Sequence, residues 1–315
     1  MEVDYPKDKV EILVGSDGSQ DTTAEIVQKY TNHGIHFYAF DINRGKTLVQ
    51  NDLVEHSKGE ILVFTDAASF IRPDALKKLV GNFADERVGC VAGKMRFINT
   101  DSNLTTQSQG LYWKYQSKLR EWESKLGALI GVDGPLYAVR RQYYVPLGNN
   151  LISDLLTPLL VLEQGKKVIL ESEAVVDEDP TLKAEHEFNT RRRITLRGLV
   201  GLFHCIRLLN PVKHPLLGSQ IFFHKLVRWF VGPLMIINFL ACAALLSHGL
   251  FNIIFIFYLM FIFSALVGWL ASYFGKTIKL FAIPYYFILI NFAATMGVVD
   301  FIRRKQAVTW KPVRE

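Results

Sequence analysis

The sequence predicts an α/β domain followed by a hydrophobic helical region. Three observations lead to this prediction. Short apolar runs alternate with helical runs of about ten residues in the first half, a pattern typical of βαβ units and of a mostly parallel sheet. Three long apolar stretches fill the second half. Charged side chains, which make up 21% of the 315 residues, almost vanish between Phe230 and Ile302.

The alternation can be followed along the first half of the chain. The expected strands cover residues 10–14, 35–40, 60–65 and 88–92, and the expected helices cover 22–30, 47–57 and 74–83. Polar turns follow two of these strands, around Asp17 and Asp66. Open α/β sheets bind ligands at the carboxyl ends of their strands, so we expect a ligand site at this edge.

The second half predicts helices that cross a bilayer. Its apolar stretches, at 230–247, 250–274 and 280–302, are each near the roughly 20 residues that a spanning helix needs. Buried core helices are the alternative, but three successive runs leave no polar face to solvate. Two amphipathic segments before them are expected at the membrane interface. The predicted division is 1–198 (α/β domain), 199–228 (interface helices), 229–302 (membrane region) and 303–315 (basic tail).

The charge balance is basic, with 36 Lys and Arg against 30 Asp and Glu. Several of these cations flank the hydrophobic part, and we interpret them as membrane-surface charges: Lys213, Lys225, Arg228, Arg303, Arg304 and Lys305. The three cysteines are widely spaced and lack CxxC spacing, which argues against a disulfide framework and a structural zinc site.

The charges also pose a problem of orientation. The loop with Lys276 and Lys279 and the first domain belong in the cytosol by the positive-inside rule. Three crossings would then place the basic tail outside. Either the rule fails, or one stretch does not cross, and Pro284 makes a broken or re-entrant third segment an option.

Two turns carry groups suited to a nucleotide. Asp17 lies in a Ser-Asp-Gly-Ser turn, where a carboxylate can accept a hydrogen bond from a base or a ribose hydroxyl. Lys46 ends an Asn-Arg-Gly-Lys turn before a helix, where a cation could meet a diphosphate. An ordinary helix cap and a solvated loop are the respective alternatives.

Three further sites could carry chemistry. Asp66 ends a buried strand, and its carboxylate could hold Mg²⁺ or Mn²⁺ on a diphosphate. Asp154 precedes an apolar helix, either as a general base or because the helix dipole favours an acid there. Arg192 and Arg193 could neutralise a leaving diphosphate, or they could be solvated or lipid-facing.

Taken in order, these pieces resemble glycosyltransferase family 2, and within it the membrane-embedded synthases of cellulose, chitin, hyaluronan and poly-N-acetylglucosamine. The turn at Asp17 is similar to the family's DGSxDxT segment, and the turn ending at Lys46 to its NxGK. Asp66 stands at the metal-binding DxD. Three more motifs complete the resemblance: Gly131-Val132-Asp133-Gly134 at the acceptor-side glycine motif, Asp154 at the base of ED…G, and Arg193 at the arginine of QxxRW. The closing Trp310, Val313 and Arg314 also look family-like.

The resemblance implies a GT-A-like fold, that of nucleotide-diphospho-sugar transferases. It implies inverting transfer of a sugar from a nucleoside diphosphate, with UDP expected, to a polysaccharide or lipid-linked acceptor. Asp154 would be the base and Asp66 the metal ligand. The donor and acceptor would meet Asp17, Lys46, Gly131, Asp133, Gly134, Arg192 and Arg193. A multi-pass cell-membrane protein with a cytoplasmic catalytic domain is expected, with partner subunits of an export complex and no nucleic acid.

The chain also departs from the family pattern. Ala68 replaces the second acid of DxD, and Ser153 replaces the acid before the base. Thr190 and Ile194 replace the Gln and Trp of QxxRW. The family's first strand and PxYNE segment would precede Tyr5, so we expect an N-terminally incomplete domain.

These departures keep a second hypothesis open, an inactive or truncated member that binds a nucleotide or a partner subunit. A transporter is a third, which predicts ionisable residues inside the spans; the stretch from Phe230 to Phe274 contains almost none.

Overall fold

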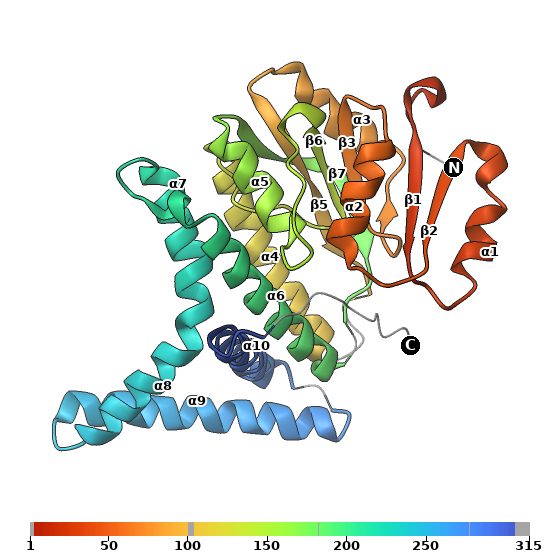
Figure 1. Cartoon of the computed structure of the whole chain (residues 1–315). Helices are drawn as coiled ribbons and strands as arrows, with labels where there is room; N and C mark the ends of the chain where they lie inside the picture. Colours follow the sequence, from red (N-terminus) through yellow and green to blue (C-terminus); the bar gives the residue numbers. More distant parts are fainter. Residues whose placement is uncertain (1–2, 100–103, 182, 277, 306–315) are drawn as a thin grey trace.

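The computed structural model describes residues 3–99, 104–181, 183–276 and 278–305. The family-like residues Trp310, Val313 and Arg314 lie outside this range. Figure 1 shows the two parts that the sequence predicts, an α/β domain and a helical extension below and beside it.

The strands form two sheets. In the smaller sheet, β1 (Ile12–Asp17) and β2 (Ile35–Phe40) are parallel. The larger sheet has the order β3-β6-β5-β7-β4, with strands β3 (Ile61–Thr65), β4 (Phe70–Ile71), β5 (Val88–Phe97), β6 (Leu136–Arg140) and β7 (Lys167–Glu178).

The expectation of a mostly parallel sheet is wrong for this larger sheet. Within the described residues, only its β5–β7 pairing is parallel, and its three other pairings are antiparallel. The physical reason is that β6 is buried on both faces between β3 and β5. An apolar run of this kind looks the same in the sequence whichever way the strand points.

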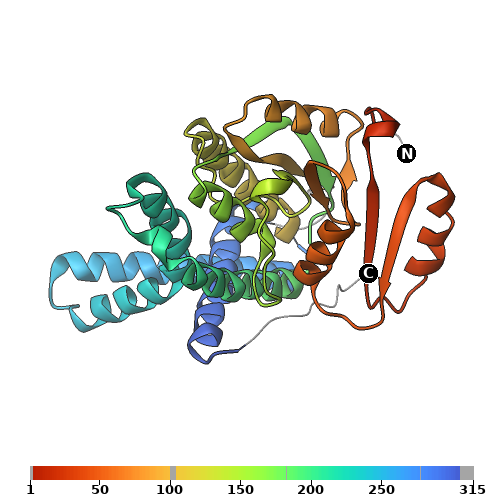
Figure 2. The same cartoon turned by 45° about the horizontal axis from the view of Figure 1, so that its top comes forward.

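The helices of the α/β domain cover the sheets (Figures 1 and 2). They are α1 (Thr23–Gln28), α2 (Lys46–His56), α3 (Ala75–Gly81), α4 (Leu104–Lys125) and α5 (Ser153–Glu163). The strands and helices expected in the first 97 residues are present with shifted ends. The sequence analysis did not anticipate α4, β6 or β7.

The helical extension begins with α6 (Ala184–His204), which runs through the domain boundary expected at residue 198. A continuous helical run follows, made of α7 (Pro215–Ile221), a π-helical segment (Phe222–Val227) and α8 (Arg228–Ala244). Next come α9 (Gly249–Tyr273) and α10 (Lys279–Ile302). Pro284 lies inside α10 and does not break it.

Three helical segments are long and apolar enough to cross a membrane: Pro215–Ala244, Gly249–Tyr273 and Leu280–Ile302. They do not form a simple bundle. In Figure 2, α8 and α9 lie side by side as a hairpin that projects from the body. In Figure 1, α10 is seen almost end-on while α9 is seen from the side, so α10 crosses the base of the hairpin.

One hydrophobic core joins the α/β domain to the helical extension. Leu156 of α5, Leu199 of α6, Trp229 of α8 and Val298 of α10 are buried in the same cluster. Gly198 permits this contact, because a Cβ there would lie 2.4 Å from the Trp229 ring. The packing holds α6 against the start of α5, where Asp154 lies.

Candidate functional site

Three of the predicted site residues converge on one glycine. A Cβ placed on the buried Gly134 would lie 3.3 Å from Lys46 Nζ, 3.4 Å from Asp154 Oδ2 and 3.6 Å from Asp66 Oδ2. Lys46 and Asp66 also form an ion pair with each other. The absent side chain of Gly134 therefore leaves open a space that a cation and two carboxylates line.

The fold delivers these side chains from separate elements. Lys46 is the first residue of α2, Asp66 directly follows β3, and Asp154 is the second residue of α5. Gly134 lies in the loop before β6, which pairs with β3. Loops at one edge of a sheet are brought together by strand pairing, so residues about 100 positions apart become neighbours.

Asp17 organises the turn that presents Lys46. Its carboxylate accepts hydrogen bonds from the backbone N–H of Arg44 at 2.7 Å and of Gly45 at 2.8 Å. Gly45 has a φ of +93°, a conformation that favours glycine. Asp17 therefore holds the Asn-Arg-Gly-Lys turn in place, and within the described residues its side chain meets this turn rather than the Gly134 space.

The electrostatic surroundings of Asp154 suit a base. Burial raises the pKa of its carboxyl above the ordinary value of 3.8, and the nearby Asp66 acts in the same direction. Lys46, Lys225 and Arg197 oppose this shift. A carboxylate with a raised pKa accepts a proton more readily than an exposed aspartate does.

Two arginines of α6 lie near this carboxylate. Burial lowers the pKa of Arg193 to about 10, with Arg197 adding to the shift and Asp154 opposing it. Arg197 donates hydrogen bonds to the Leu151 carbonyl and, at 3.4 Å, to the Thr47 hydroxyl. It thus ties the start of α2 to the segment before Asp154, a role that the sequence analysis missed.

Arg192 does not join them. Its guanidinium forms two hydrogen bonds with Asp300 of α10, at 2.5 Å and 2.9 Å. Successive residues of a helix point in directions about 100° apart, and here Arg192 points toward α10. The structure therefore separates two residues to which the sequence analysis assigned one function.

The glycine-containing loop is held by an arginine of α4. Arg120 forms an ion pair with the buried Asp133 and donates a hydrogen bond of 3.0 Å to the Gly131 carbonyl. Gly131 in turn lies beside Lys225, whose Nζ would be 3.1 Å from a Cβ at this position. The charge of Asp133 is thus satisfied within the protein, which favours a role in shaping the loop.

Two cations interpreted as membrane-surface charges have partners within the protein. Lys225 lies beside Gly131 and is one of the charges that act on Asp154. Arg228 donates a hydrogen bond of 2.7 Å to Gln116 of α4. A position at the membrane surface stays a prediction for both residues. The π-helical segment turns Lys225 toward the site, and such segments often occur at functional positions.

The site fits a divalent cation only with help from a ligand. Among the described residues, no three His, Cys, Asp or Glu side chains could hold a metal ion by themselves. Glu178 is a further acid whose charge interacts with this site: burial and the charges of Asp66 and Asp133 raise its pKa, and Ser69 donates a hydrogen bond of 2.7 Å to it. Asp66 together with diphosphate oxygens matches the way Mg²⁺ is usually bound.

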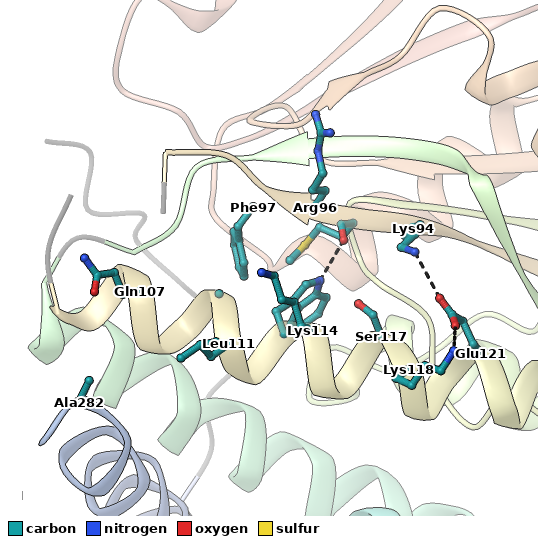
Figure 3. A pocket seen from close by; sticks show the side chains of 13 residues that line it. Lys94, Arg96, Phe97, Gln107, Leu111, Lys114, Ser117, Lys118, Glu121 and Ala282 are labelled. Carbon is teal, nitrogen blue, oxygen red and sulfur yellow. Dashed lines mark hydrogen bonds and ion pairs between the residues drawn. The ribbon is translucent and has the colours of Figure 1, made fainter. Parts of the chain in front are cut away.

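A cavity of about 570 Å³ lies away from this site. Figure 3 shows it between α4 and the end of β5, with Lys94 and Lys118 both hydrogen-bonded to Glu121. None of the predicted site residues lines it. The residues around Gly134 are therefore the candidate functional site, and they combine a cation, a metal-compatible acid and a base.

Comparison with a family model gives a match for residues 3–145, to "Glycosyl transferase family 2". The hyaluronan synthase of Streptococcus pyogenes is 27% identical over 146 residues, which cover 43% of this chain and 34% of that protein. The poly-beta-1,6-N-acetyl-D-glucosamine synthase of Staphylococcus epidermidis is 29% identical over 136 residues, 42% of this chain and 32% of that one. The matches therefore span about a third of the curated relatives.

Among solved structures, the mannosyltransferase PcManGT of Pyrobaculum calidifontis, in complex with GDP-Man and Mn²⁺, has a TM-score of 0.71. The similarity covers 97% of this chain and 81% of that one, at 22% sequence identity. At this identity the likeness shows a shared fold, and it extends over the helical extension as well as the α/β domain.

Proposed function

We propose that this chain is a family 2 glycosyltransferase, because residues 3–145 match the family model. It would transfer a sugar from a nucleoside diphosphate to a hydroxyl of a polysaccharide or a lipid-linked acceptor at a membrane. The observation that carries this proposal is the convergence of Lys46, Asp66 and Asp154 on Gly134. This convergence supports the proposal, because a cation able to bind a diphosphate and a candidate base line one small space.

The proposed reaction is a single inverting displacement. The acceptor oxygen bonds to the anomeric carbon as the bond from that carbon to the diphosphate oxygen breaks, and Asp154 takes the hydroxyl proton. Lys46 and Arg193 lie where they can stabilise the charge on the departing nucleoside diphosphate. Arg197 acts as a positioning residue, because it fixes the segment before Asp154.

Asp66 is the proposed protein ligand for Mg²⁺ or Mn²⁺. The cation, when bound, neutralises charge on the diphosphate. Glu178 lies close enough to influence this site, and its hydrogen bond from Ser69 fixes the turn after Asp66. We therefore expect Asp66→Asn to weaken metal-dependent donor binding.

The test compares turnover and donor binding in protein reconstituted in lipid. Asp154→Asn should abolish sugar transfer while the donor still binds with its normal affinity. Asp85→Asn is a matched control, since Asp85 pairs with Arg87 in a turn away from the site. Full activity of Asp154→Asn would rule out Asp154 as the base.

The nucleotide is a separate question, which binding measurements with UDP and GDP sugars address. We expect the UDP sugar to bind more tightly. A preference for the GDP sugar would show that the donor carries guanine instead of uracil. The proposed transfer chemistry would be unaffected.

A second candidate function is nucleotide-dependent binding without transfer. Ala68 favours it, because the metal-binding motif then retains one acid, Asp66. Tight donor binding with no turnover of any sugar nucleotide by the unaltered protein would support this function over the first.

A further inference from the structure

The three apolar helices differ in what surrounds them. The α8–α9 hairpin carries exposed apolar side chains, for example Ile237 at 64% and Phe257 at 64% exposure. In contrast, α10 packs against α6. Ala184 packs on Tyr285 near one end, and the rings of Phe203 and Phe301 are 5.0 Å apart at the other.

Polar contacts join α6 and α10 all along this seam. Tyr286 donates a hydrogen bond of 2.6 Å to Glu187, which also pairs with Arg191 at 2.8 Å. Further along, Arg192 binds Asp300. Gly297 lets the backbones meet, since a Cβ there would be 2.6 Å from the Arg192 carbonyl oxygen.

The charges of α6 make it unsuitable for a lipid interior. Six acidic or basic residues lie within it: Glu185, Glu187, Arg191, Arg192, Arg193 and Arg197. Each charge at the centre of a bilayer costs about 2.5–3.5 kcal/mol even on the most lenient scale. Moreover, the other side of α6 packs on α5, where Gly201 contacts Leu156. If α10 crossed the bilayer, α6 and part of the α/β domain would have to enter it too.

The hairpin has none of these constraints. From Trp229 to Gly275 the sequence contains no Asp, Glu, Lys or Arg. Asn238, a polar residue in α8, accepts a hydrogen bond of 3.0 Å from Tyr258 of α9. The two helices also stack Phe239 on Phe255, with ring centroids 5.1 Å apart. A paired, uncharged hairpin of this length can cross a hydrocarbon core.

We propose that the α8–α9 hairpin alone crosses the bilayer, and that α10 lies along the membrane surface on the side of the α/β domain. The exposed side chains of α10, such as Leu280 at 77% and Ile283 at 62%, then meet the lipid boundary. The chain returns to its starting side after two crossings. The catalytic domain and the C-terminal tail therefore share one side of the membrane.

This topology removes the conflict in the charge pattern. The tip between α8 and α9 carries no Lys or Arg, only His248. In this topology the basic residues that follow the hairpin, up to the last described residue, fall on the side of the α/β domain: Lys276, Lys279, Arg303, Arg304 and Lys305. The positive-inside rule places such residues in the cytosol, which is the side where a sugar nucleotide would be used.

Site-directed labelling tests the proposal. We would introduce one cysteine each at Glu86→Cys in the α/β domain, Ser247→Cys at the hairpin tip and Glu315→Cys at the C-terminus. A membrane-impermeant maleimide is then applied to vesicles of each orientation. The three native cysteines are buried, and the unaltered protein gives their background labelling. Labelling in detergent confirms that each new thiol can react.

The expected result is labelling of Glu86→Cys and Glu315→Cys from one side and of Ser247→Cys from the other. Labelling of Glu315→Cys from the side of Ser247→Cys would show three crossings and overturn the proposal. Labelling of all three from one side, or of Ser247→Cys in detergent alone, would show that the hairpin does not cross.

A second measurement avoids cysteine substitution. A green fluorescent protein fused to the C-terminus of the full chain should fluoresce in a bacterial host, because it folds on the cytoplasmic side. An alkaline phosphatase fusion at the same place should be inactive. A dark green fluorescent protein fusion together with an active alkaline phosphatase fusion would place the C-terminus outside the cytoplasm. That outcome would contradict the proposal, whatever the catalytic activity of the protein.

Discussion

Two regions of this molecule enclose charged side chains, and they treat them differently. Along the α6–α10 seam, Asp300 receives Arg192 and Lys305, the latter at 2.9 Å. At the candidate site, no hydrogen bond to the Asp154 carboxylate is present among the described residues, and burial raises its pKa. Charges joined by hydrogen bonds hold helices together, whereas a carboxylate without a hydrogen bond next to open space is available for a ligand.

The largest difference should come from changing one aspartate in each region. Asp154→Asn should lower sugar transfer by about 10²–10⁴-fold, the usual contribution of a general base. It should leave thermal stability unchanged or higher, because folding encloses a charge there that gains little compensation. Turnover and the melting temperature, measured on the same preparation, check both parts. A lower melting temperature would contradict this account of Asp154.

The matched change in the α6–α10 seam should lower stability and leave turnover nearly unchanged. Asp300→Asn leaves Arg192 without its counter-charge, so we expect a loss of about 1–3 kcal/mol in stability. Turnover at low temperature should change little, because Arg192 points away from the site. Thermal unfolding in detergent measures the first effect. A variant that loses turnover but keeps its stability would place Asp300 in the catalytic machinery instead.

A smaller effect is expected from filling the open space. In Gly134→Ala the new methyl group would lie 3.3 Å from Lys46 Nζ, so the lysine must shift by a few tenths of an ångström. We expect roughly tenfold weaker donor binding, since misplacing a binding group by up to 1 Å costs up to about 10²-fold. Gly81→Ala is the control, because a Cβ there meets nothing within 4 Å. Equal donor affinities for the two variants would show that Gly134 does not lie in the donor-binding site.

The smallest effect concerns pH. Asp154 must be ionised to accept a proton, so transfer should fall as the pH drops through its folded-state pKa, which is above 3.8. The sign for stability is opposite. Because the pKa is raised by folding, the favourable contribution of the neutral acid is complete below the unfolded pKa and is lost as the pH rises through the folded one. A pH profile of kcat/KM and melting curves of Asp154→Asn check the two signs.

Much of the α/β domain could be predicted from local patterns. Strands and helices in the first 97 residues have clear periodicity, and Lys46, Asp66 and Asp154 stand at ends of elements where ligands bind. Other parts had no such signal. The residues of α4 gave no clear pattern, and Arg120, which clamps Gly131 and Asp133, could not be recognised because its partners lie 11 and 13 positions away, on an irregular loop.

The sequence by itself determined the general organisation of the protein: an α/β domain with motifs that resemble those of glycosyltransferase family 2, followed by apolar helices. These features depend on local composition and spacing, which a linear chain displays directly. Only the tertiary structure decided which residues the charged side chains contact. Arg192 pairs with Asp300, and Lys225 lies beside Gly131. The physical reason is that burial and charge pairing depend on which elements pack together. Lys225 looks like a membrane-flanking charge in the sequence, and only the packing shows that it lies beside Gly131.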